Sequence, residues 1–346
     1  MSLTVKSYTS WQPLEEIIIG RVYTPEYFAF IKDDAVRSQL SQLLDETAED
    51  LDQLQKVIED FGAVVRRPDL PNINKFMGWQ ERGDDVPLPP LTPRDWQITF
   101  GDKLLRLLSL RELDTICDDY NRVQPGSVID PHCGGYNPNH PLVDAVASCI
   151  VRVGTDVFFD NSEWMTDQHL EWIRDNVLDN RYRVRRAVTH GHGDAVFAIL
   201  KPGVILSSMH DADINYREDF PGWEVHKVWD ASILAAMEIG KFKHENFNGR
   251  WYVQGQQPTE EFASFVDTYL NKWTGYVKET VFDVNCLVLD EHNVVFSSYN
   301  KEVFDFCKQH QIEPIVCEQR HKYFFDSGIS CCTQDIRRRG ELETYL

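Results

Sequence analysis

Several features that mark disulfide-rich, metal-stabilised or membrane proteins are missing from this 346-residue sequence. Its eight cysteines form no CxxC pair and no compact Cys/His cluster with zinc-ligand spacing, which argues against a disulfide framework and a structural metal site. No stretch approaches 18 consecutive apolar residues, the length typical of a membrane-spanning helix. Residues 1–11 are polar and lack the apolar core of a signal peptide. We therefore expect a cytoplasmic protein.

Positive charge is also scarce, with 35 Lys and Arg against 55 Asp and Glu and a formal net charge of −20. This charge opposes nonspecific binding to nucleic acid or to an anionic membrane surface. A small cationic ligand suits such a field better. The expected partners are therefore small molecules, with neither nucleic acid nor membrane among them, and a homodimer is left open.

The chain is an ordinary globular sequence, 42% hydrophobic and 26% charged, in which strand-like and helical patterns alternate. Residues 14–20 are predicted to form a buried strand and residues 33–61 a long amphipathic helix that Gly62 stops. Residues 70–93 are rich in Pro, Gly and Asp and are predicted to be a long loop. No stretch has the composition of a linker, so we expect one α/β domain over residues 1–346.

The remaining elements follow the same alternation of short strands and helices. Strands are predicted over residues 63–67, 98–100, 143–159 with a turn at Gly154, 182–188, 195–200 and 204–207 as a hairpin around Pro202-Gly203, 281–289, 294–297 and 314–317; helices are predicted over residues 104–120, 167–178, 259–273 and 301–309.

Four places combine reactive side chains with a chain geometry that exposes them. Asp95 lies in the polar turn Thr92-Pro93-Arg94-Asp95 before a strand, where it can also be a simple turn or cap residue. Asp144 begins the strand that runs to Gly154, where it can also be a solvated carboxylate. Cys331 follows a Gly-containing turn, and a buried structural thiol is the alternative.

The fourth place is Thr189-His190-Gly191-His192-Gly193-Asp194. If this segment is extended, His190, His192 and Asp194 project from one face, because side chains alternate along a strand. Metal ligation is one use of such a set, but no other dense ligand group supports it. General acid/base work by one His beside one carboxylate is the better fit.

A Cys, a His and separate carboxylates suit covalent attack on an electron-poor carbon, with the His moving the proton. They also suit a guanidinium substrate, which is always cationic and matches carboxylates with paired N–H donors. Asp95 and Asp194 are the candidate acids for holding it.

These residues lie within motifs that resemble the amidinotransferases of the guanidino-group-modifying superfamily, most of all the arginine:glycine amidinotransferases. The matches reach from Ser7-Tyr8 to the C-terminus. The most specific pair is His192-x-Asp194-Ala195-x-Phe197 together with Cys331-x-Thr333-x-Asp335-Ile336-Arg337-Arg338-Arg339-Gly340; shorter matches include Pro13-Leu14-Glu15-Glu16, Arg67-Pro68-Asp69, Pro93-Arg94-Asp95 and Asn285.

The resemblance implies the pentein fold, an α/β propeller of five ββαβ-type modules around a pseudo-fivefold axis. It also implies a ping-pong transfer without metal or organic cofactor. Cys331 attacks the guanidino carbon of L-arginine, His192 protonates the departing amine, and ornithine leaves an amidino-cysteine. An acceptor amine, glycine by family default, then takes the amidino group, while Asp95 and Asp194 hold the guanidinium nitrogens.

The sequence departs from the family pattern at several positions. The acid that orients the catalytic His in the family falls on Val146, and Asp144, two residues earlier, is the predicted substitute. Ser330 replaces the usual His before the nucleophile. Asp211 replaces the Arg that grips the donor carboxylate, and Lys278 falls on a serine that assists it, so both are candidate substrate-binding residues.

Two other functions remain open from the sequence. The same cysteine chemistry with water as acceptor would make the protein a guanidino hydrolase that yields citrulline and ammonia. A catalytically inactive relative that binds a guanidino ligand is the other alternative. In all three cases Arg337, Arg338 and Arg339 are interpreted as an ion-paired scaffold behind Cys331 rather than as a binding patch.

Overall fold

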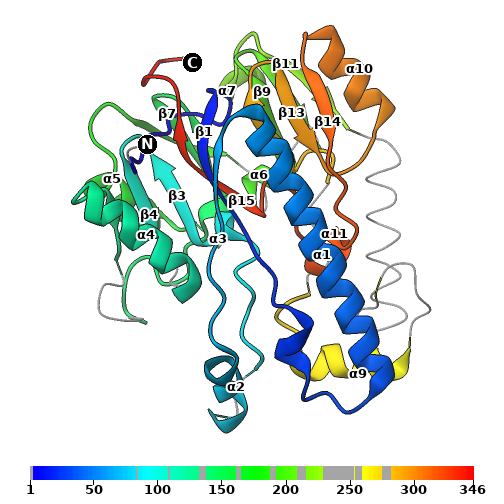
Figure 1. Cartoon of the computed structure of the whole chain (residues 1–346). Helices are drawn as coiled ribbons and strands as arrows, with labels where there is room; N and C mark the ends of the chain where they lie inside the picture. The colour runs from blue at the N-terminus through cyan, green and yellow to red at the C-terminus, as the bar shows by residue number, and fades with distance from the viewer. Residues whose placement is uncertain are drawn as a thin grey trace.

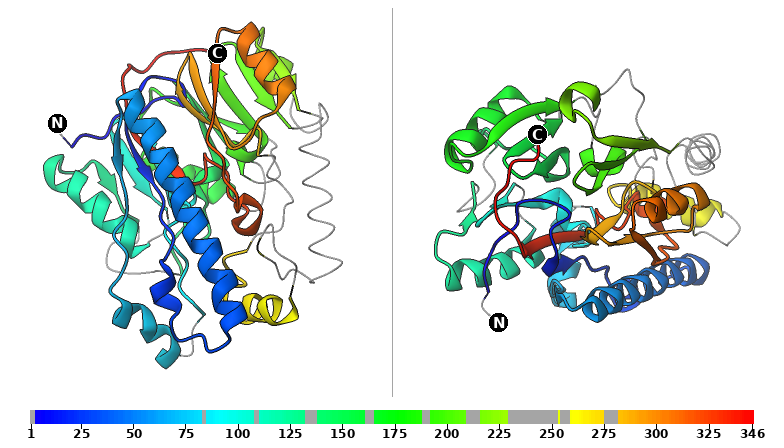
Figure 2. Two further views of the ribbon diagram at one scale, coloured as in Figure 1. Left: turned by 45° about the vertical axis from the view of Figure 1, so that its right-hand side comes forward. Right: turned by 90° about the horizontal axis from the view of Figure 1, so that it is seen from above.

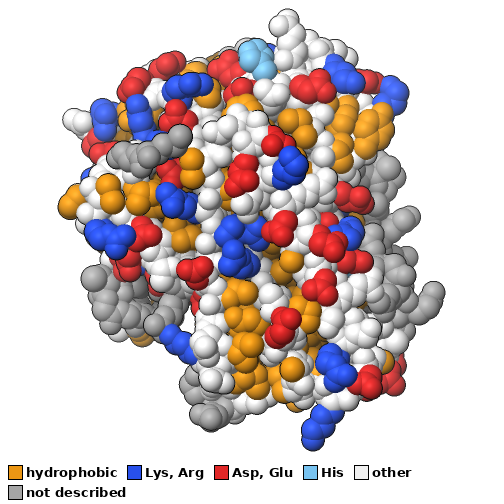
Figure 3. Space-filling model, in the orientation of Figure 1, with side chains coloured by type: hydrophobic (Ala, Val, Ile, Leu, Met, Phe, Trp, Pro, Cys, Tyr) orange, Lys and Arg blue, Asp and Glu red, His pale blue; other side chains and the backbone are white. Residues whose placement is uncertain are grey.

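A computed structural model describes residues 3–82, 85–107, 110–131, 138–160, 165–187, 192–208, 216–228, 253, 259–274 and 282–346. Small sheets surround a central region, and the long helix α1 (Asp34–Phe61) runs along one side (Figures 1 and 2). None of the helices in the described ranges combines the length and the apolarity that a membrane crossing needs. Acidic side chains are spread over the face shown in Figure 3, and basic side chains lie among them.

Five three-stranded sheets with one shared topology form the framework. In each sheet two antiparallel strands are followed by a helix that leads to a third strand, which lies parallel to the second. The modules are β15 (Thr333–Arg338), β1 (Leu14–Ile19), α1, β2 (Val64–Arg66); β3 (Gln97–Phe100), β4 (Lys103–Arg106), α4 (Arg111–Val123), β5 (Val128–Ile129); β6 (Ile150–Val153), β7 (Asp156–Asp160), α5 (Asp167–Asn176), β8 (Arg183–Ala187); β9 (Phe197–Lys201), β10 (Val204–Ser207), α7 (Tyr216–Asp219), β11 (Glu224–Lys227); and β12 (Leu287–Asp290), β13 (Asn293–Phe296), α10 (Lys301–Gln309), β14 (Glu313–Val316). The five-module arrangement implied by the resemblance is confirmed.

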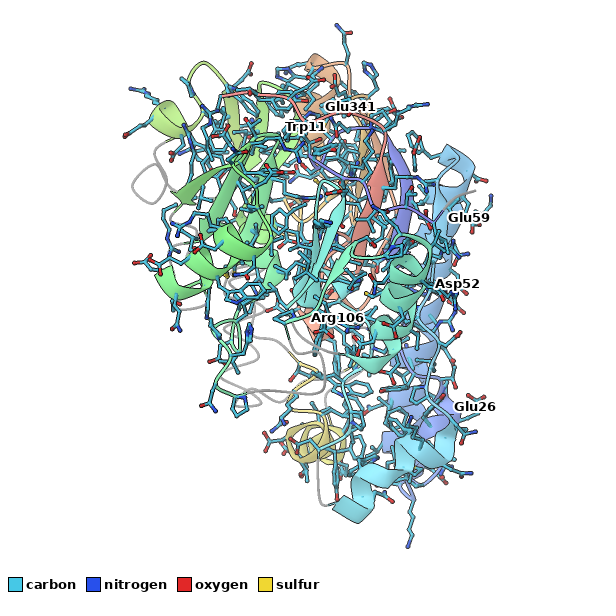
Figure 4. The ribbon with its side chains drawn as sticks, turned by 90° about the vertical axis from the view of Figure 1, so that its left-hand side faces the viewer. Trp11, Glu26, Asp52, Glu59, Arg106 and Glu341 are labelled. Atoms are coloured by element: carbon cyan, nitrogen blue, oxygen red, sulfur yellow. The ribbon has the colours of Figure 1, made fainter. Side chains whose placement is uncertain are left out.

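The first module is built from both ends of the chain. Strand β15, near the C-terminus, pairs antiparallel with β1, with Ile17 opposite Asp335 and Ile19 opposite Thr333. The flanking segments also meet, because Lys6 Nζ lies 2.7 Å from Glu341 Oε1. Trp11 and Glu341 accordingly lie at the same end of the molecule (Figure 4). The chain thus closes its ring of modules with its last strand.

Helix α1 forms as its periodicity predicts. Asp33 caps it by accepting hydrogen bonds from Ala35 N at 2.9 Å and Val36 N at 3.0 Å. Gly62 ends it with a φ of 102°, a left-handed conformation that glycine adopts without strain. Its apolar face is buried in the largest core cluster through residues that include Val36, Leu40, Leu43, Leu44, Leu51, Leu54 and Ile58.

The prediction of an irregular loop over residues 70–93 is wrong, because helix α2 (Ile73–Arg82) lies within it. Phe76 and Trp79, one helical turn apart, are buried and pack on aromatic side chains of the segment before α1. The high Pro and Gly content of the flanks obscured this short periodic stretch. The rest of the segment runs as non-repetitive chain to the short helix α3 (Pro93–Trp96).

Two further boundaries differ from the prediction. The start of the predicted helix over residues 104–120 is the strand β4, since Leu104 and Leu105 lie in the sheet and helix α4 begins at Arg111. The predicted strand over residues 143–159 is a hairpin of β6 and β7 around Gly154, preceded by turns and the short 3-10 helix η2 (Ala147–Cys149). In both places the buried apolar residues of two consecutive elements follow each other closely in the sequence. The hydrophobic pattern therefore does not show where one element ends and the next begins.

The other predicted elements are confirmed with shifts of a few residues at their ends, except for the first half of the strand predicted over residues 281–289: residues 282–285 form a turn and a bend, and β12 begins at Leu287. The confirmed elements include the hairpin of β9 and β10 around Pro202-Gly203, helix α9 (Glu260–Tyr269), helix α10 and strand β14. The short helices η1 (Pro25–Phe28), α6 (Gly193–Val196) and α11 (Lys322–Phe325) were not predicted.

Candidate active site

A turn or short helix precedes the first strand of every module, and these five segments supply the candidate site. Two or three residues before the strand stand, in chain order, Asp95 in α3, Ser148 in η2, Asp194 in α6, Asn285 before β12 and Cys331 before β15. Helix α3 contacts both η2 and β15, and α6 contacts η2. The repeated topology therefore brings together side chains that lie far apart in the sequence.

Cys331 is 3% exposed and is held by side chains from two other modules. Asn285 Nδ2 donates a hydrogen bond to its Sγ at 3.0 Å, and Asp194 Oδ2 lies 3.9 Å from the same sulfur. Asn285 Oδ1 also accepts from the backbone N–H groups of Ser330, at 2.9 Å, and Cys331, at 3.3 Å. The amide of Asn285 thus fixes both the thiol and the turn that carries it.

Gly328 makes this arrangement sterically feasible. A Cβ at Gly328 would lie 2.4 Å from Asn285 Oδ1 and 2.6 Å from its Cγ, closer than nonbonded atoms approach. The glycine thus permits the side chain of Asn285 to approach the turn closely.

Asp194 is held from the same turn, because Ser330 Oγ donates a hydrogen bond to its Oδ2 at 2.7 Å. The serine that replaces the usual histidine before the nucleophile thus contacts a site carboxylate. Residues 193–196 are helical, so the prediction of an extended segment is wrong for this part. His190 lies outside the described residues.

His192 lies next to Asp95, with 3.7 Å between Nδ1 and Asp95 Oδ1. This separation is too long for a hydrogen bond but close for an ion pair. The structure does not bring Asp144 to His192: Asp144 is exposed in a turn before η2, and the predicted strand that would align it with Val146 is absent. Val146 itself lines the same pocket as His192.

Two buried carboxylate oxygens at the site accept no hydrogen bond from any described residue, Asp95 Oδ1 and Asp194 Oδ1. Buried carboxylate oxygens without a hydrogen bond are costly, so they favour a ligand that donates hydrogen bonds and carries positive charge. Burial raises the pKa of Asp194, although Arg94, His192 and the Ser330 hydroxyl oppose the shift.

The thiol responds to the same environment. Burial, together with the charges of Asp194 and Asp95, raises the pKa of Cys331 well above its ordinary value, and the Asn285 hydrogen bond works against this rise. Burial likewise raises the pKa of the neighbouring Cys332 to about 12, and Cys332 Sγ lies 3.1 Å from Ser327 Oγ. Cys332 belongs to the largest hydrophobic core cluster and, unlike Cys331, is not among the residues that line the active-site pocket.

An open pocket gives access to the site, with an empty volume of about 1000 Å³ including open solvent. Asp95, His192 and Cys331 line it, together with Trp96, Val146, Lys272, Trp273, Asp326 and residues of the 88–92 segment. A second cavity lies behind Asp194 and Ser330 and is lined by Arg94, Arg152 and Arg338. The ring of turns separates the two.

Two of the three arginines behind the nucleophile, Arg337 and Arg338, are ion-paired as interpreted from the sequence, whereas no ion pair of Arg339 is found among the described residues. Arg338 Nε lies 2.9 Å from Asp335 Oδ2, and Arg337 contacts Glu15 at 3.0 Å and Glu16 at 2.9 Å. Arg339 is exposed, and its backbone N–H donates to Pro13 O at 2.8 Å. Arg152 and Arg94 also bind Asp335, at 2.8 and 3.2 Å, so three guanidinium groups share one buried carboxylate.

Two of the predicted substrate-binding residues, Asp211 and Lys278, lie outside the described residues. Within the described part of the chain, no three His, Cys, Asp or Glu side chains are grouped so that they could hold a metal ion. Asn285 and Ser330 are the site residues for which sequence reasoning found no role. The sequence marked Asn285 only as a motif match and Ser330 only as a replacement of the family's usual His. Neither observation indicates which side chain the residue contacts, because the contacts depend on the fold.

Comparison with known proteins places the chain among amidinotransferase-like sequences. It is 24% identical to an L-arginine:L-lysine amidinotransferase of Pseudomonas savastanoi pv. phaseolicola, over 99% of this chain and 96% of that protein. It is 21% identical to the mitochondrial glycine amidinotransferase of Xenopus laevis, over 99% of this chain and 85% of that protein. No family model matches the chain.

The fold comparison agrees. The solved structure of inosamine-phosphate amidinotransferase from Streptomyces griseus superposes with a TM-score of 0.67 at 18% identity, covering 100% of this chain and 99% of that one. The resemblance found in the sequence motifs is therefore confirmed: along its whole length the chain is similar to amidinotransferases, and it has the pentein fold that they share.

Proposed function

We propose that this protein is an amidinotransferase that moves the amidino group of L-arginine to a small primary amine through an amidino-cysteine on Cys331. The observation that carries the proposal is the convergence of two buried carboxylate oxygens that accept no hydrogen bond, on Asp95 and Asp194, beside a pocket-lining thiol. A planar cation with several N–H donors satisfies both acids and presents its electron-poor carbon to the sulfur.

In the first half-reaction the sulfur of Cys331 bonds to the guanidino carbon, and the bond from that carbon to the side-chain nitrogen of arginine breaks. The thiol proton passes to His192, which returns it to the departing nitrogen, so that ornithine leaves. A bound guanidinium offsets the charges of Asp95 and Asp194, which otherwise raise the pKa of Cys331. The donor thus favours ionisation of the thiol that attacks it.

In the second half-reaction a neutral acceptor amine bonds to the amidino carbon and the carbon–sulfur bond breaks. His192 takes a proton from the attacking nitrogen and returns it to the sulfur, which restores the thiol. The names of the similar proteins include lysine, glycine and inosamine phosphate as substrates. The proposal therefore keeps a primary amine as acceptor, with glycine as one candidate.

Asp95 takes the role that the sequence assigned to Asp144. Its carboxylate lies 3.7 Å from His192, whereas Asp144 is exposed in the turn before η2. A carboxylate beside the imidazole stabilises the protonated form that appears between the two proton transfers. Asp95 thus contacts both the His and, in the proposed complex, the guanidinium.

The test is incubation of the purified protein with arginine and a panel of amines that includes glycine and lysine. We expect ornithine, a new guanidino compound, and an amidino adduct on Cys331 detectable by mass spectrometry. Cys331→Ala should abolish all three, while the matched control Cys332→Ala should retain them. Citrulline and ammonia in place of ornithine would identify a hydrolase, and binding of arginine without any adduct would identify a non-catalytic relative.

A further inference from the structure

Lys272 stands out in the active-site pocket because of its charge. Among the described residues that line the pocket, it is the only Lys or Arg. The carboxylates of Asp95 and, behind it, Asp194 lie at the thiol, so the positive charge of Lys272 adds the opposite sign to the same pocket. An extended zwitterion with a cationic head and a carboxylate at its other end matches this distribution.

One partner of Lys272 is an exposed carboxylate that a ligand can replace. Its Nζ lies 2.7 Å from Asp85 Oδ2, and the two side chains are 63% and 40% exposed. Exposed pairs of this kind contribute little to stability, because water screens them and both side chains lose rotamer freedom. Exchange of the Asp85 carboxylate for another carboxylate therefore costs the fold little.

The chain next to Lys272 is firmly placed. Trp273 is 4% exposed, donates a hydrogen bond from Nε1 to Pro87 O at 3.1 Å, and stacks on Phe325 with ring centroids 6.4 Å apart. Both Trp273 and Phe325 line the pocket. The backbone that carries Lys272 is thus anchored to the pocket wall, while its long side chain extends to the exposed pair with Asp85.

From these observations we propose that Lys272 is a specificity-determining residue that binds the α-carboxylate of the guanidino donor in exchange for Asp85. The donor class is then a guanidino amino acid rather than a simple guanidino amine. This inference rests on the proposed transferase function and adds to it the group that the pocket uses to select its donor.

The experiment compares arginine with agmatine, which has the same guanidino group and lacks the carboxylate. With a fixed acceptor amine, we expect Lys272→Met to lower kcat/KM for arginine by about 10- to 100-fold, mainly through KM, and to leave kcat/KM for agmatine within about twofold. Lys56→Met is the matched control, because Lys56 also forms an exposed pair, with Asp60 at 2.6 Å on helix α1, away from the pocket. Asp85→Asn, which removes the competing Asp85 carboxylate from Lys272, should not raise KM for arginine, and a raised KM would contradict the exchange.

Each outcome has a definite meaning. Equal losses with arginine and agmatine in Lys272→Met, or equal use of the two donors by the unmodified protein, would overturn the role of Lys272 while leaving the transferase intact. Absence of product and of a Cys331 adduct with both donors in the unmodified protein would instead overturn the proposed function. Circular dichroism of Lys272→Met confirms that any loss is not a loss of folding.

Discussion

At the scale of single residues, the site consists of a buried thiol, Cys331, and the carboxylates of Asp95 and Asp194, which together with burial raise the pKa of that thiol. Asn285 donates to Cys331 Sγ, and this contact is the feature that favours the thiolate against burial and two carboxylates. The reactivity of the thiol therefore depends on an uncharged neighbour and on the ligand that offsets Asp95 and Asp194.

The first prediction concerns Asn285→Ala. Removal of the amide donor raises the pKa of Cys331 further, so alkylation by iodoacetamide in the absence of substrate should be slower at every pH below that pKa. The rate of Cys331 labelling against pH, followed by peptide mass spectrometry, measures this shift. The labelling of Cys332, whose partner is Ser327, serves as the internal control. An unchanged profile would show that Asn285 does not act on the sulfur.

The second prediction separates the two candidate partners of His192. Asp95→Asn should lower kcat by about 100-fold or more, because it removes the carboxylate beside His192 and one acid of the guanidinium site. Asp144→Asn should stay within about twofold of the unmodified protein, since Asp144 is an exposed turn residue. The pair is compared by steady-state kinetics with arginine. The reverse order of effects would restore Asp144 to the catalytic role.

At the scale of elements, the five turns before the first strands position the site, and each turn depends on close packing against another module. The turn before β15 is the tightest, because Gly328 lies against the side chain of Asn285. A methyl group there displaces either the amide or the thiol.

Gly328→Ala should therefore lower adduct formation on Cys331 far more than it lowers stability. The clash lies at the turn that presents the nucleophile, outside the β15–β1 pairing. Adduct yield by mass spectrometry and the urea midpoint, measured on the same sample, test this expectation. Gly126→Ala is the control, because a Cβ at Gly126 meets no atom within 4 Å although its φ of 80° carries strain. Similar adduct yields in the two variants would contradict the packing argument.

Part of the fold and part of the site could be predicted from the sequence, because some elements and residues are marked by their local sequence alone. Long periodic helices such as α1, and residues such as Cys331, His192 and Asp95 that lie in specific motifs, are marked locally. The contacts of Asn285 with Cys331 and of Asp95 with His192 are set by how separate modules meet, and nothing near either residue indicates its partner. The prediction for Asp144 rested on a strand that the structure lacks, because η2 and its preceding turns occur there.

At the scale of the whole molecule, one buried ionic cluster joins three modules. Asp335 on β15 receives Arg338 from its own strand, Arg152 from β6 and Arg94 from α3. Burial alone would raise the pKa of Asp335, but the arginines outweigh it and hold the pKa well below its usual range. The cluster ties the strand that follows the nucleophile to the neighbouring modules.

Asp335→Asn should destabilise the protein by about 3–5 kcal/mol at pH 7, because it leaves buried guanidinium groups without their counter-charge. Since the folded-state pKa is depressed, the stabilisation by Asp335 is present above the unfolded-state pKa of about 4 and is lost as the pH falls through the folded value. The difference in the free energy of unfolding between variant and unmodified protein should thus be full at pH 7 and should narrow as the pH falls below about 4. Urea unfolding at pH 7 and pH 3 measures it.

Asp52→Asn is the matched control for this experiment. Asp52 lies on the outer side of α1 (Figure 4), is 74% exposed, and pairs with Arg67 at 3.0 Å. Its removal should cost about 1 kcal/mol or less. If both variants lost a comparable free energy of unfolding, the contribution of the Asp335 cluster to stability would not depend on its burial.

The ring closure has a consequence for how the protein loses activity. Strand β15 is both the partner that completes the β1 sheet and the segment that directly follows Cys331. Separation of β15 from β1 would also break the buried ionic cluster of Asp335, which ties β15 to Arg152 on β6 and Arg94 on α3. The Cys331 thiol can therefore leave Asn285 and Asp194 only when the contacts between modules are also lost, so activity should fall in step with global denaturation.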